Sequence, residues 1–534
     1  MGFFADLKMY SRFALGLPGF LRKTVSLDEA RTIIERGLAE REASFLRLVK
    51  RGIFGYKKSP YLSLMKLARC EMGDIESLVR SEGLEGALRQ LREAGVYISF
   101  EEFKGRKPVE RNGQVISLGP HAFDNPFLGP HYTASTGGST GAGTRVETDL
   151  AHLAAQSHHM MVTRAIHEVL DVPTAIWRGV LPDGSGINNL LRAAHIGRVP
   201  DRWFSPVRYD DVKPSFKYRM ATQGTVIIGR LCGVSLPWPE HVGIDRADLI
   251  ARWAVDMVKE RGACLILAPV SRALRVAVRA REEGMSLSGA TFMIAGEPPT
   301  PAKVREIMKS GARYFTTYGL AESGRIGMGC RNPVSANDLH LMKDAFAVIQ
   351  HPRKVPGWDI EVGAFNVTSL LPSAPKLMLN VEVDDYGIHE RRACGCALED
   401  MGFDEHLREI YSFRKLTGEG ITLVGSEIVH ILESVLPARF GGTALDYQLM
   451  EEEDEQGFTK LSLIVSPKID IDDEEAIIRV MLEAMSKESV GADSARSILS
   501  QAHSLRVCRK EPILTPRGKL MPLYLSRRPS SAGQ

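Results

Sequence analysis

The stretch that decides the fold runs from Cys264 to Lys309 and reads CLILAPVSRALRVAVRAREEGMSLSGATFMIAGEPPTPAKVREIMK. It contains two short apolar runs, Cys264–Leu267 and Phe292–Ala295, and ends in a helical segment, Pro301–Lys309. Short apolar runs that alternate with helical segments are typical of an α/β sheet with helices on its faces. We therefore predict such a sheet for the middle of the chain, from about residue 130 to 330.

The same reading extends to other segments. Within the α/β region, Thr225–Ile228 is a further apolar run and Asp245–Glu260 a further helical stretch. Before it, apolar positions recur at helical spacing in Leu27–Leu48 and again near Asp74–Ala94. Asn112-Gly113 marks a turn in a connector or short hairpin.

The chain divides into three predicted parts. Its 534 residues are too many for one hydrophobic core. We predict a helical segment at 1–110 and a main body at 111–412, whose last part, 340–410, is strand-rich. A small α+β domain follows at 413–534, and its length is usual for a domain. The acidic run Glu451–Glu455 reads as a solvated hairpin tip.

Composition excludes several classes of protein. Apolar residues make up 44% and charged residues 25%, as in ordinary globular proteins. The net charge of +3 shows no nucleic-acid footprint. No apolar run approaches the roughly 20 residues that span a bilayer, so we expect no stable membrane insertion. Phe13–Leu21 is interrupted by Pro18 and lacks a small-residue cleavage site, which argues against a signal peptide. A helix packed on the body is favoured there over a membrane-touching helix. Seven cysteines without a disulfide-like framework favour a cytoplasmic protein.

Three short motifs carry the chemistry. Ser135–Gly141 (STGGSTG) is a loop whose backbone N–H groups and hydroxyls can surround a phosphate. In Tyr318–Glu322 (YGLAE), the tyrosine can stack on an adenine ring and the carboxylate can hold Mg²⁺. Pro512–Lys519 (PILTPRGK) ends in a lysine that can offset charge building up between a carboxylate and an α-phosphate.

Each motif taken alone also has an ordinary structural explanation. The loop is equally compatible with a flexible surface turn, and it is no Walker A loop because Gly-Lys-Ser/Thr is missing. Tyr318 and Glu322 fit a core tyrosine followed by a helix-starting glutamate, and most C-terminal lysines are merely solvated. The combination and its order along the chain give the motifs their weight.

A separate set of residues suits a metal. Cys394 and Cys396 lie in a turn-like Ala-Cys-Gly-Cys, while Cys330 and His340 are ten residues apart. Three cysteines and a histidine can form a closed tetrahedral zinc site. The two pairs are distant in sequence, so buried thiols and a hydrogen-bonded histidine remain the alternative.

Together the three motifs resemble the phosphate loop, the Tyr-Gly-x-x-Glu motif and the C-terminal catalytic lysine of the adenylate-forming superfamily. Acyl-CoA synthetases, luciferases and nonribosomal peptide synthetase adenylation domains belong to it. Ala295–Pro299 (AGEPP) is similar to the segment that lines the adenine pocket there. Asp338–Asp344 (DLHLMKD) is similar to a Gly-Leu-His-x-x-Glu-Asp stretch of the phenylacetate–CoA ligase-like branch, whose phosphate loop also tends to carry threonine where Thr144 stands. The resemblance covers about residues 130–534.

The resemblance implies an α/β fold, with a large multi-subdomain N-terminal adenylation domain and a small mobile α+β C-terminal domain. It implies ATP and Mg²⁺ as cofactors, with Glu322 on the metal and Lys519 and Thr140 acting with it in catalysis. The implied nucleotide-binding residues are Thr136, Gly138, Ser139, Thr140, Gly141, Gly296, Glu297, Pro298, Tyr318, Gly319, Glu322, Asp385 and Arg414. Asp385 takes the ribose position, with Asp384 as the alternative register. The branch also places cysteines and a histidine near Cys330, His340, Cys394 and Cys396, which implies structural zinc.

One departure from the family concerns the hinge before the small domain. The family pattern there is Gly-Arg-x-Asp-Asp, whereas Ile410–Gly420 (IYSFRKLTGEG) keeps an arginine, Arg414, and lacks the paired aspartates.

The resemblance implies that a small carboxylic acid is activated as an acyl-adenylate and passed to a thiol, CoA or phosphopantetheine. The altered hinge leaves the acceptor open, with an acyl or peptidyl carrier protein or an amine as the alternative and a non-catalytic nucleotide-binding protein as the third reading. Aryl, medium-chain acyl and amino acids all remain open as substrates.

Overall fold

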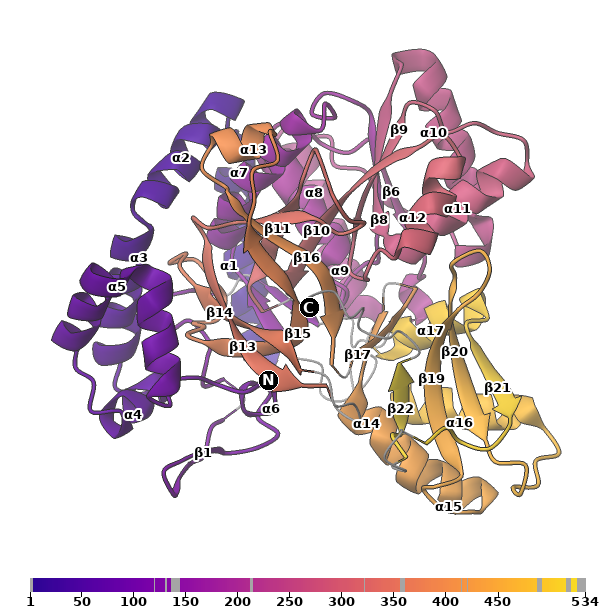
Figure 1. Cartoon of the computed structure of the whole chain (residues 1–534). Helices are drawn as coiled ribbons and strands as arrows, with labels where there is room; N and C mark the ends of the chain where they lie inside the picture. Colours follow the sequence, from indigo (N-terminus) through magenta and orange to yellow (C-terminus); the bar gives the residue numbers. More distant parts are fainter. Residues whose placement is uncertain are drawn as a thin grey trace.

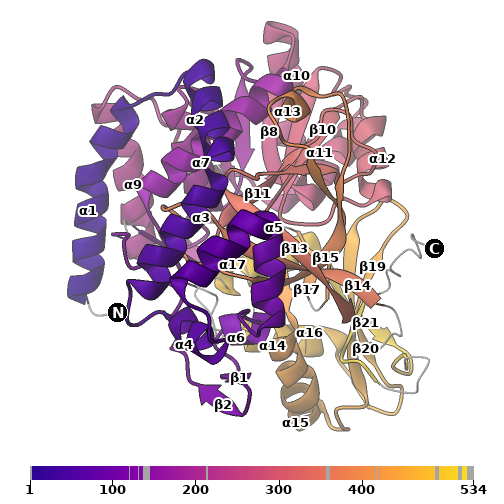
Figure 2. The ribbon, with the colours of Figure 1, turned by 60° about the vertical axis from the view of Figure 1, so that its left-hand side comes forward.

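A twelve-stranded sheet organises the chain in a computed structural model, which describes residues 3–119, 121–129, 132–135, 145–211, 215–320, 322–355, 361–413, 415–419, 421–486, 492–514 and 520–525. The strand order is β13-β14-β15-β16-β12-β11-β10-β9-β8-β5-β6-β7. The helices of the N-terminal part lie on one side and a small C-terminal unit on the other (Figures 1 and 2). The fold is therefore mixed α/β, with a large sheet and a separate smaller one.

One half of the large sheet is parallel. Its strands are β5 (Thr174–Trp177), β6 (Arg202–Ser205), β7 (Pro239–His241), β8 (Cys264–Pro269), β9 (Ala290–Ala295) and β10 (Arg313–Leu320). Every residue of β8 is buried, which explains its continuous apolar sequence, because helices cover both faces of a parallel sheet. Those helices are α7 (Leu150–Ile166), α8 (Ser185–His195), α9 (Ser215–Leu231), α10 (Ala247–Arg261), α11 (Val270–Glu282) and α12 (Pro301–Lys309). The 3-10 turns are η2 (Tyr209–Asp211) and η3 (Ile244–Arg246).

The predicted strands at Cys264–Leu267 and Phe292–Ala295 and the helix at Pro301–Lys309 are confirmed. The apolar run Thr225–Ile228 is wrong as a strand, because it lies inside α9. Thr222, Thr225 and Val226 are buried while Ile227 is exposed, so the apolar positions follow a helical period there. The predicted helix Leu27–Leu48 is two helices, because Glu40 leaves the helical conformation at φ −98° and ψ 9°.

The other half of the sheet is antiparallel. Its strands are β11 (Gly324–Gly329), β12 (Leu339–Leu341), β13 (Phe346–Lys354), β14 (Glu361–Ser369), β15 (Val381–Arg391) and β16 (Glu405–Ser412), with α13 (Ala397–Asp400) between the last two. The N-terminal helices pack against it through a core that includes Ile34, Phe45 and Phe346. They are α2 (Leu27–Ala39), α3 (Arg41–Val49), the π-helical η1 (Lys50–Phe54), α4 (Pro60–Leu67), α5 (Met72–Glu93) and α6 (Phe100–Phe103). The first helix, α1 (Phe3–Arg22), packs instead against the parallel half.

Three small hairpins lie outside the two larger sheets. Strands β1 (Val109–Arg111) and β2 (Gln114–Ile116) pair around the predicted turn at Asn112-Gly113. The other hairpins are β3 (Tyr132–Ser135) with β4 (Arg145–Thr148), and β17 (Lys415–Gly418) with β18 (Ile421–Val424). In α1, Phe13, Leu17 and Leu21 are buried in the core that also covers β5, as expected of a packed helix. No helix among the described residues has the length and apolar character needed to cross a membrane.

The C-terminal unit has its own four-stranded sheet in the order β21-β20-β19-β22. The strands are β19 (Tyr447–Glu453), β20 (Thr459–Val465), β21 (Leu505–Arg509) and β22 (Leu523–Leu525). The helices are α14 (Gly425–His430), the π-helical η4 (Ile431–Val435), α15 (Leu436–Phe440), α16 (Glu474–Ser486) and α17 (Ala492–Ala502). The acidic run is only partly a hairpin tip, because β19 continues to Glu453 and Glu451 is buried.

Candidate functional site

A cavity of about 270 Å³ opens at the carboxyl ends of the parallel strands. Arg178, which directly follows β5, lines it together with Leu267 of β8 and Ala295 at the end of β9. In sheet order, β6 and β7 extend away from β5 on one side, and β8, β9 and β10 on the other. The direction of winding therefore reverses between β5 and β8. In open α/β sheets, ligands bind outside the carboxyl ends at such a switch point.

Segments that are far apart in sequence meet at this cavity. Gly296 of the predicted adenine segment and Gly319 of the Tyr-Gly motif both line it. The hairpin β3–β4, which flanks the predicted phosphate loop, borders it as well: Thr148 lines the cavity, and the Tyr132 hydroxyl donates to Asn188, another lining residue. The loop residues Thr136, Gly138, Ser139, Thr140 and Gly141 lie outside the described residues, as do Arg414 and Lys519.

Two glycines allow the backbone to approach closely at this edge. A Cβ on Gly319 would lie 2.6 Å from the carbonyl oxygen of Gly324. Gly324 has φ +85°, and a Cβ there would lie 1.5 Å from Nε2 of Gln156 on α7. Both positions therefore require glycine, which brings β10, β11 and α7 together around the cavity.

Tyr318 and Asp385 form a pair across two strands of the large sheet. The Tyr318 hydroxyl donates to Oδ2 of Asp385 at 2.8 Å, and Ser412 donates to the other carboxylate oxygen. Burial, together with the Asp385 charge, raises the pKa of Tyr318 well above its usual value, so the phenol stays a neutral donor. Asp384 is fully buried, and Oδ1 of its carboxylate lies 3.7 Å from Nη1 of Arg353. Of the two aspartates, Asp385 is the one that contacts Tyr318.

Glu322 is buried and forms an ion pair with Lys104, which follows α6 in the N-terminal part. The predicted magnesium ligand thus already has a positive partner within the chain. Its chemistry suits a hard cation, and a metal ion would compete with the Lys104 ammonium for the same carboxylate.

Glu297 is buried beside α11. One carboxylate oxygen accepts a hydrogen bond from the Ser271 hydroxyl at 2.5 Å, and the other lies 3.8 Å from Nζ of Lys303. Lys303 also donates to the Thr459 hydroxyl of β20 at 2.7 Å. The predicted adenine segment is therefore linked through Lys303 to the C-terminal unit.

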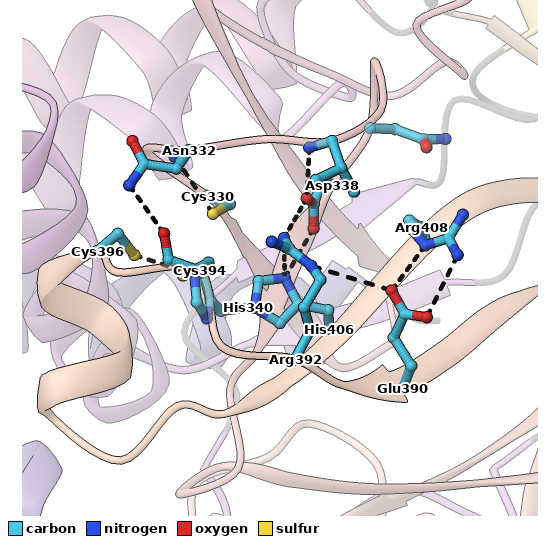
Figure 3. Close-up of polar contacts among 12 residues, drawn as sticks. Cys330, Asn332, Asp338, His340, Glu390, Arg392, Cys394, Cys396, His406 and Arg408 are labelled. Carbon is cyan, nitrogen blue, oxygen red and sulfur yellow. Dashed lines mark hydrogen bonds and ion pairs between the residues drawn. The ribbon is translucent and has the colours of Figure 1, made fainter.

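The four predicted zinc ligands lie together (Figure 3). Cys330 follows β11, His340 lies on β12, and Cys394 and Cys396 precede α13. One ligand atom from each residue lies within 4.8 Å of the others. Nδ1 of His340 is 2.6 Å from the carbonyl oxygen of Phe403, and Nε2 is 3.2 Å from Sγ of Cys396. A proton on Nδ1 leaves the Nε2 lone pair directed at the sulfurs, as a metal-binding histidine requires.

Hydrogen bonds also surround this cluster. A hydrogen bond from the Cys330 thiol, with the help of His340, lowers the pKa of Cys396, which favours a thiolate. Behind His340, the His406 ring is 2.7 Å from a carboxylate oxygen of Asp338, and Arg392 donates to the other oxygen of that carboxylate (Figure 3). The donor set of three sulfurs and one imidazole nitrogen fits zinc.

Three cavity-lining arginines had no role in the sequence analysis: Arg178, Arg192 on α8 and Arg325 on β11. Arg178 had a detectable signal, because it directly follows the apolar run of β5, and such positions lie at the ligand-binding edge of a parallel sheet. Arg192 and Arg325 had none, since an arginine within a helix or strand is usually a surface residue.

No protein-family model and no curated protein matches the sequence. Among solved structures, the chain is similar to a 2-hydroxyisobutyryl-CoA ligase in complex with 2-HIB-AMP, at 14% identity and a TM-score of 0.44, over 95% of this chain and 91% of that one. It is similar to o-succinylbenzoate CoA synthetase from Bacillus subtilis (12%, TM-score 0.41, 74% and 68% covered). It is also similar to an amide bond synthetase from Marinactinospora thermotolerans (12%, TM-score 0.37, 82% and 76% covered).

Proposed function

We propose that this protein activates a small carboxylic acid with ATP and transfers the acyl group to an acceptor. The observation that carries the proposal is the meeting of separate segments at one cavity: Gly296, Gly319 and the hairpin that flanks residues 136–144 all border it. That cavity lies at the switch point of a parallel sheet, where this class of fold binds ligands. A chance set of motifs would have no reason to converge there.

The proposed first step joins the acid to the nucleotide. A carboxylate oxygen of the acid attacks the α-phosphorus of ATP, the bond to the bridging oxygen breaks, and pyrophosphate leaves with its electron pair. The protein contributes positioning and charge stabilisation rather than a covalent nucleophile. In this scheme Asp385, held by Tyr318 and Ser412, binds the ribose, and Lys519 stabilises the charge that builds up on the reacting oxygens.

Magnesium would neutralise charge on the phosphates when bound, and Glu322 is the residue proposed to hold it. The Lys104–Glu322 ion pair would have to open or shift for that carboxylate to become a ligand. The N-terminal part, which supplies Lys104, would then sense whether metal and nucleotide are present.

In the proposed second step, an acceptor atom attacks the acyl carbon and AMP leaves. A thiol, that of CoA or of a phosphopantetheine arm, is the acceptor we favour, because the acyl-adenylate is a reactive mixed anhydride that a thiolate opens readily. An amine or a carrier-bound thiol is the alternative, since the segment around Ile410–Gly420 lacks the paired aspartates expected at the hinge.

We also propose a structural zinc ion at Cys330, His340, Cys394 and Cys396. The convergence of four ligand atoms within 4.8 Å supports it, together with the hydrogen bond that orients His340. Closed four-ligand sites without a free position serve stability rather than catalysis. Here the ion would tie the β11–β12 turn to the segment that precedes α13.

ATP–pyrophosphate exchange tests the main proposal. Purified protein should exchange pyrophosphate in the presence of one class from a panel of aryl, fatty, amino and dicarboxylic acids. Lys519→Ala should lower exchange by at least about 100-fold, because it removes a charge that acts in the transition state. Lys468→Ala, an exposed lysine of the same unit, is the matched control and should leave the rate unchanged. Equal rates in both variants would refute the role of Lys519, and absence of exchange with every acid would refute adenylation.

A further inference from the structure

The charges that line the cavity do not balance. Its described lining carries three arginines, Arg178, Arg192 and Arg325, and a single carboxylate, that of Asp183. The negative charges of Asp183 and Glu297 raise the pKa of Arg178 and so favour its charged form. Arg192 and Arg325 are therefore the residues whose positive charge needs an explanation.

Neutral amides are the partners of these two arginines. Nη1 of Arg192 donates to Oε1 of Gln156 at 2.5 Å, and its Nη2 donates to Oδ1 of Asn189 at 3.3 Å. Nη2 of Arg325 donates to the same Asn189 oxygen at 2.8 Å. One amide oxygen thus holds both guanidinium groups close together at the cavity wall.

Further positive charge lies near this pair. Burial and the charges of Arg192, Arg164 and Arg178 all lower the pKa of Arg325. Arg164 on α7 is fully buried, and none of its three guanidinium nitrogens has a hydrogen-bond partner among the residues described. A buried charge is costly unless an opposite charge or strong hydrogen bonds compensate it. An anionic ligand beside Arg192 and Arg325 would supply that opposite charge.

His152 gives a second, independent indication. It lines the same cavity from α7 and is 3% exposed. The Ser323 backbone raises the pKa of the ring and is the smallest of the influences on it, but neither ring nitrogen has a hydrogen-bond partner of acceptable geometry in the described part of the chain. Buried polar groups are almost always hydrogen-bonded. A ligand with oxygen atoms beside Arg192 would supply the missing partner.

The nucleotide phosphates are a less suitable source of this anion than the acid. Tyr318, Asp385 and Glu322, which the proposed function assigns to the nucleotide and its metal, are not among the residues lining the cavity. Among the described residues, the cavity meets the nucleotide segments at Ala295, Gly296, Gly319 and Leu320, and the hairpin that flanks the phosphate loop at Thr148. Arg192 on α8 and Arg325 on β11 belong to none of these segments. What remains of the site once the nucleotide is assigned is a small pocket for the acid.

Resting on the proposed function, we infer that the acid substrate carries a second anionic group, and that Arg192 and Arg325 bind this group while the reacting carboxylate faces the nucleotide. The most direct class is a small dicarboxylic acid. Guanidinium groups bind carboxylates through paired N–H donors, and His152 adds a hydrogen bond.

The test uses the full-length protein and pairs of acids that differ in one anionic group: propionate with succinate, butyrate with glutarate and benzoate with phthalate. Thermal unfolding is followed with each acid alone, because a ligand that binds the folded state raises Tm without any turnover. We expect at least one dicarboxylate to raise Tm where its monocarboxylate partner does not. Arg325→Gln and Arg192→Gln should weaken that dicarboxylate by about 10- to 100-fold, the usual effect of losing a hydrogen bond to a charged group.

The controls separate this inference from the proposed function. Arg208→Gln, which removes a charge outside the cavity lining, should leave the dicarboxylate effect unchanged. A dicarboxylate shift that is lost in Arg325→Gln supports the anion site even where pyrophosphate exchange fails. Three results would overturn the inference: mono- and dicarboxylates behaving alike, the Arg192 and Arg325 variants behaving like wild type, or those variants losing ATP binding in the absence of any acid. If pyrophosphate exchange still occurs with monocarboxylates when one of these three results is found, the inference fails and the proposed function stands.

Discussion

The cysteine–histidine cluster and the arginine-lined cavity are both buried polar sites, but they are built in opposite ways. In the cluster, Cys330, His340, Cys394 and Cys396 face one another, and His340 is held from behind by the carbonyl of Phe403. In the cavity, Arg192 and Arg325 carry like charges, share one amide acceptor and face a space of about 270 Å³.

This difference indicates what each site is for. Ligands that converge on one point and are oriented by outer hydrogen bonds suit a permanent metal ion. Like charges beside a space suit a ligand that enters and leaves, since the folded protein bears the cost of the charges until it arrives. Removing a residue should therefore destabilise the protein at the cluster and stabilise the free protein at the cavity.

The largest effect is expected at the cluster. Cys396→Ser should lower the free energy of unfolding by at least about 4 kcal/mol, because metal binding to a structural zinc site contributes directly to folding. Zinc content, measured on purified protein, should fall from about one equivalent to well below it. Cys508→Ser, a cysteine on β21 outside the cluster, is the control and should change neither quantity. If the wild-type protein holds no zinc, the cluster is not a zinc site and its contrast with the cavity fails.

At Arg164, which lies near the cavity-lining Arg325, the change in stability should have the opposite sign. Arg164→Met keeps most of the side-chain volume and removes a buried charge whose guanidinium nitrogens have no hydrogen-bond partner among the described residues. We expect it to stabilise the protein by about 1–4 kcal/mol, the range seen when buried ion pairs are replaced by apolar residues. Denaturant unfolding of the ligand-free protein measures the change. The matched control is Arg198→Met, because Arg198 pairs with Asp171 at the surface and exposed pairs contribute little. Destabilisation by Arg164→Met would mean that the charge is compensated, and the contrast between the two sites would disappear.

The amino-acid sequence predicted one of these sites and missed the other for a physical reason. Cysteines and histidines are uncommon residues that readily bind metals, so the four members of the cluster could be grouped by residue type alone. Arginine is a common surface residue, and only the packing of α7, α8 and β11 brings Arg192 to Arg325. Unpaired charge is a property of the folded surroundings, which a local pattern does not contain.

The prediction of strands was limited in the same way, because a short sequence pattern does not contain its surroundings. Strands β8 and β9 were predictable because parallel strands with both faces covered are continuously apolar. The run at Thr225–Ile228 looks the same over four residues, but its neighbours Thr222 and Gly229 continue a helical period, and it lies in α9. Short apolar runs therefore need their flanking residues before strand and helix can be distinguished.

The third prediction concerns pH. Burial and the charge of Arg192 lower the pKa of His152 to about 3, although Asp149 acts in the opposite direction. An unfolded histidine titrates near 6.5, so the unfolded state binds more protons between about pH 6.5 and 3, and stability is lost as pH falls through that range. At pH 5 His152 should cost about 2 kcal/mol.

Denaturant unfolding at pH 7 and pH 5 tests this cost. The loss should be smaller in His152→Gln than in wild type, and unchanged in a control, His503→Gln, which alters an exposed histidine. A dicarboxylate bound beside Arg192 should reduce the loss in wild type, because its charge favours the imidazolium. Identical losses in wild type and His152→Gln would show that the pKa of His152 is not lowered by folding and would weaken the case for an anion site beside it.

The smallest effect is expected at the border of the cavity, where polar groups are already paired. Tyr318→Phe removes the hydrogen bond from the hydroxyl to Asp385, which is 2.8 Å long, and leaves the ring in place. If Asp385 holds the ribose, the loss of this positioning contact should raise KM for ATP by about 10-fold, as expected for a hydrogen bond to a charged group. KM for the acid should stay constant, because Tyr318 does not line the cavity. Tyr314→Phe, on the same strand, is the control for the loss of a phenol. If KM for the acid increases instead, Tyr318 contributes to acid binding and not to nucleotide binding. The division of the site into a nucleotide part and an acid part, on which the assignment of Arg192 and Arg325 depends, would then be wrong.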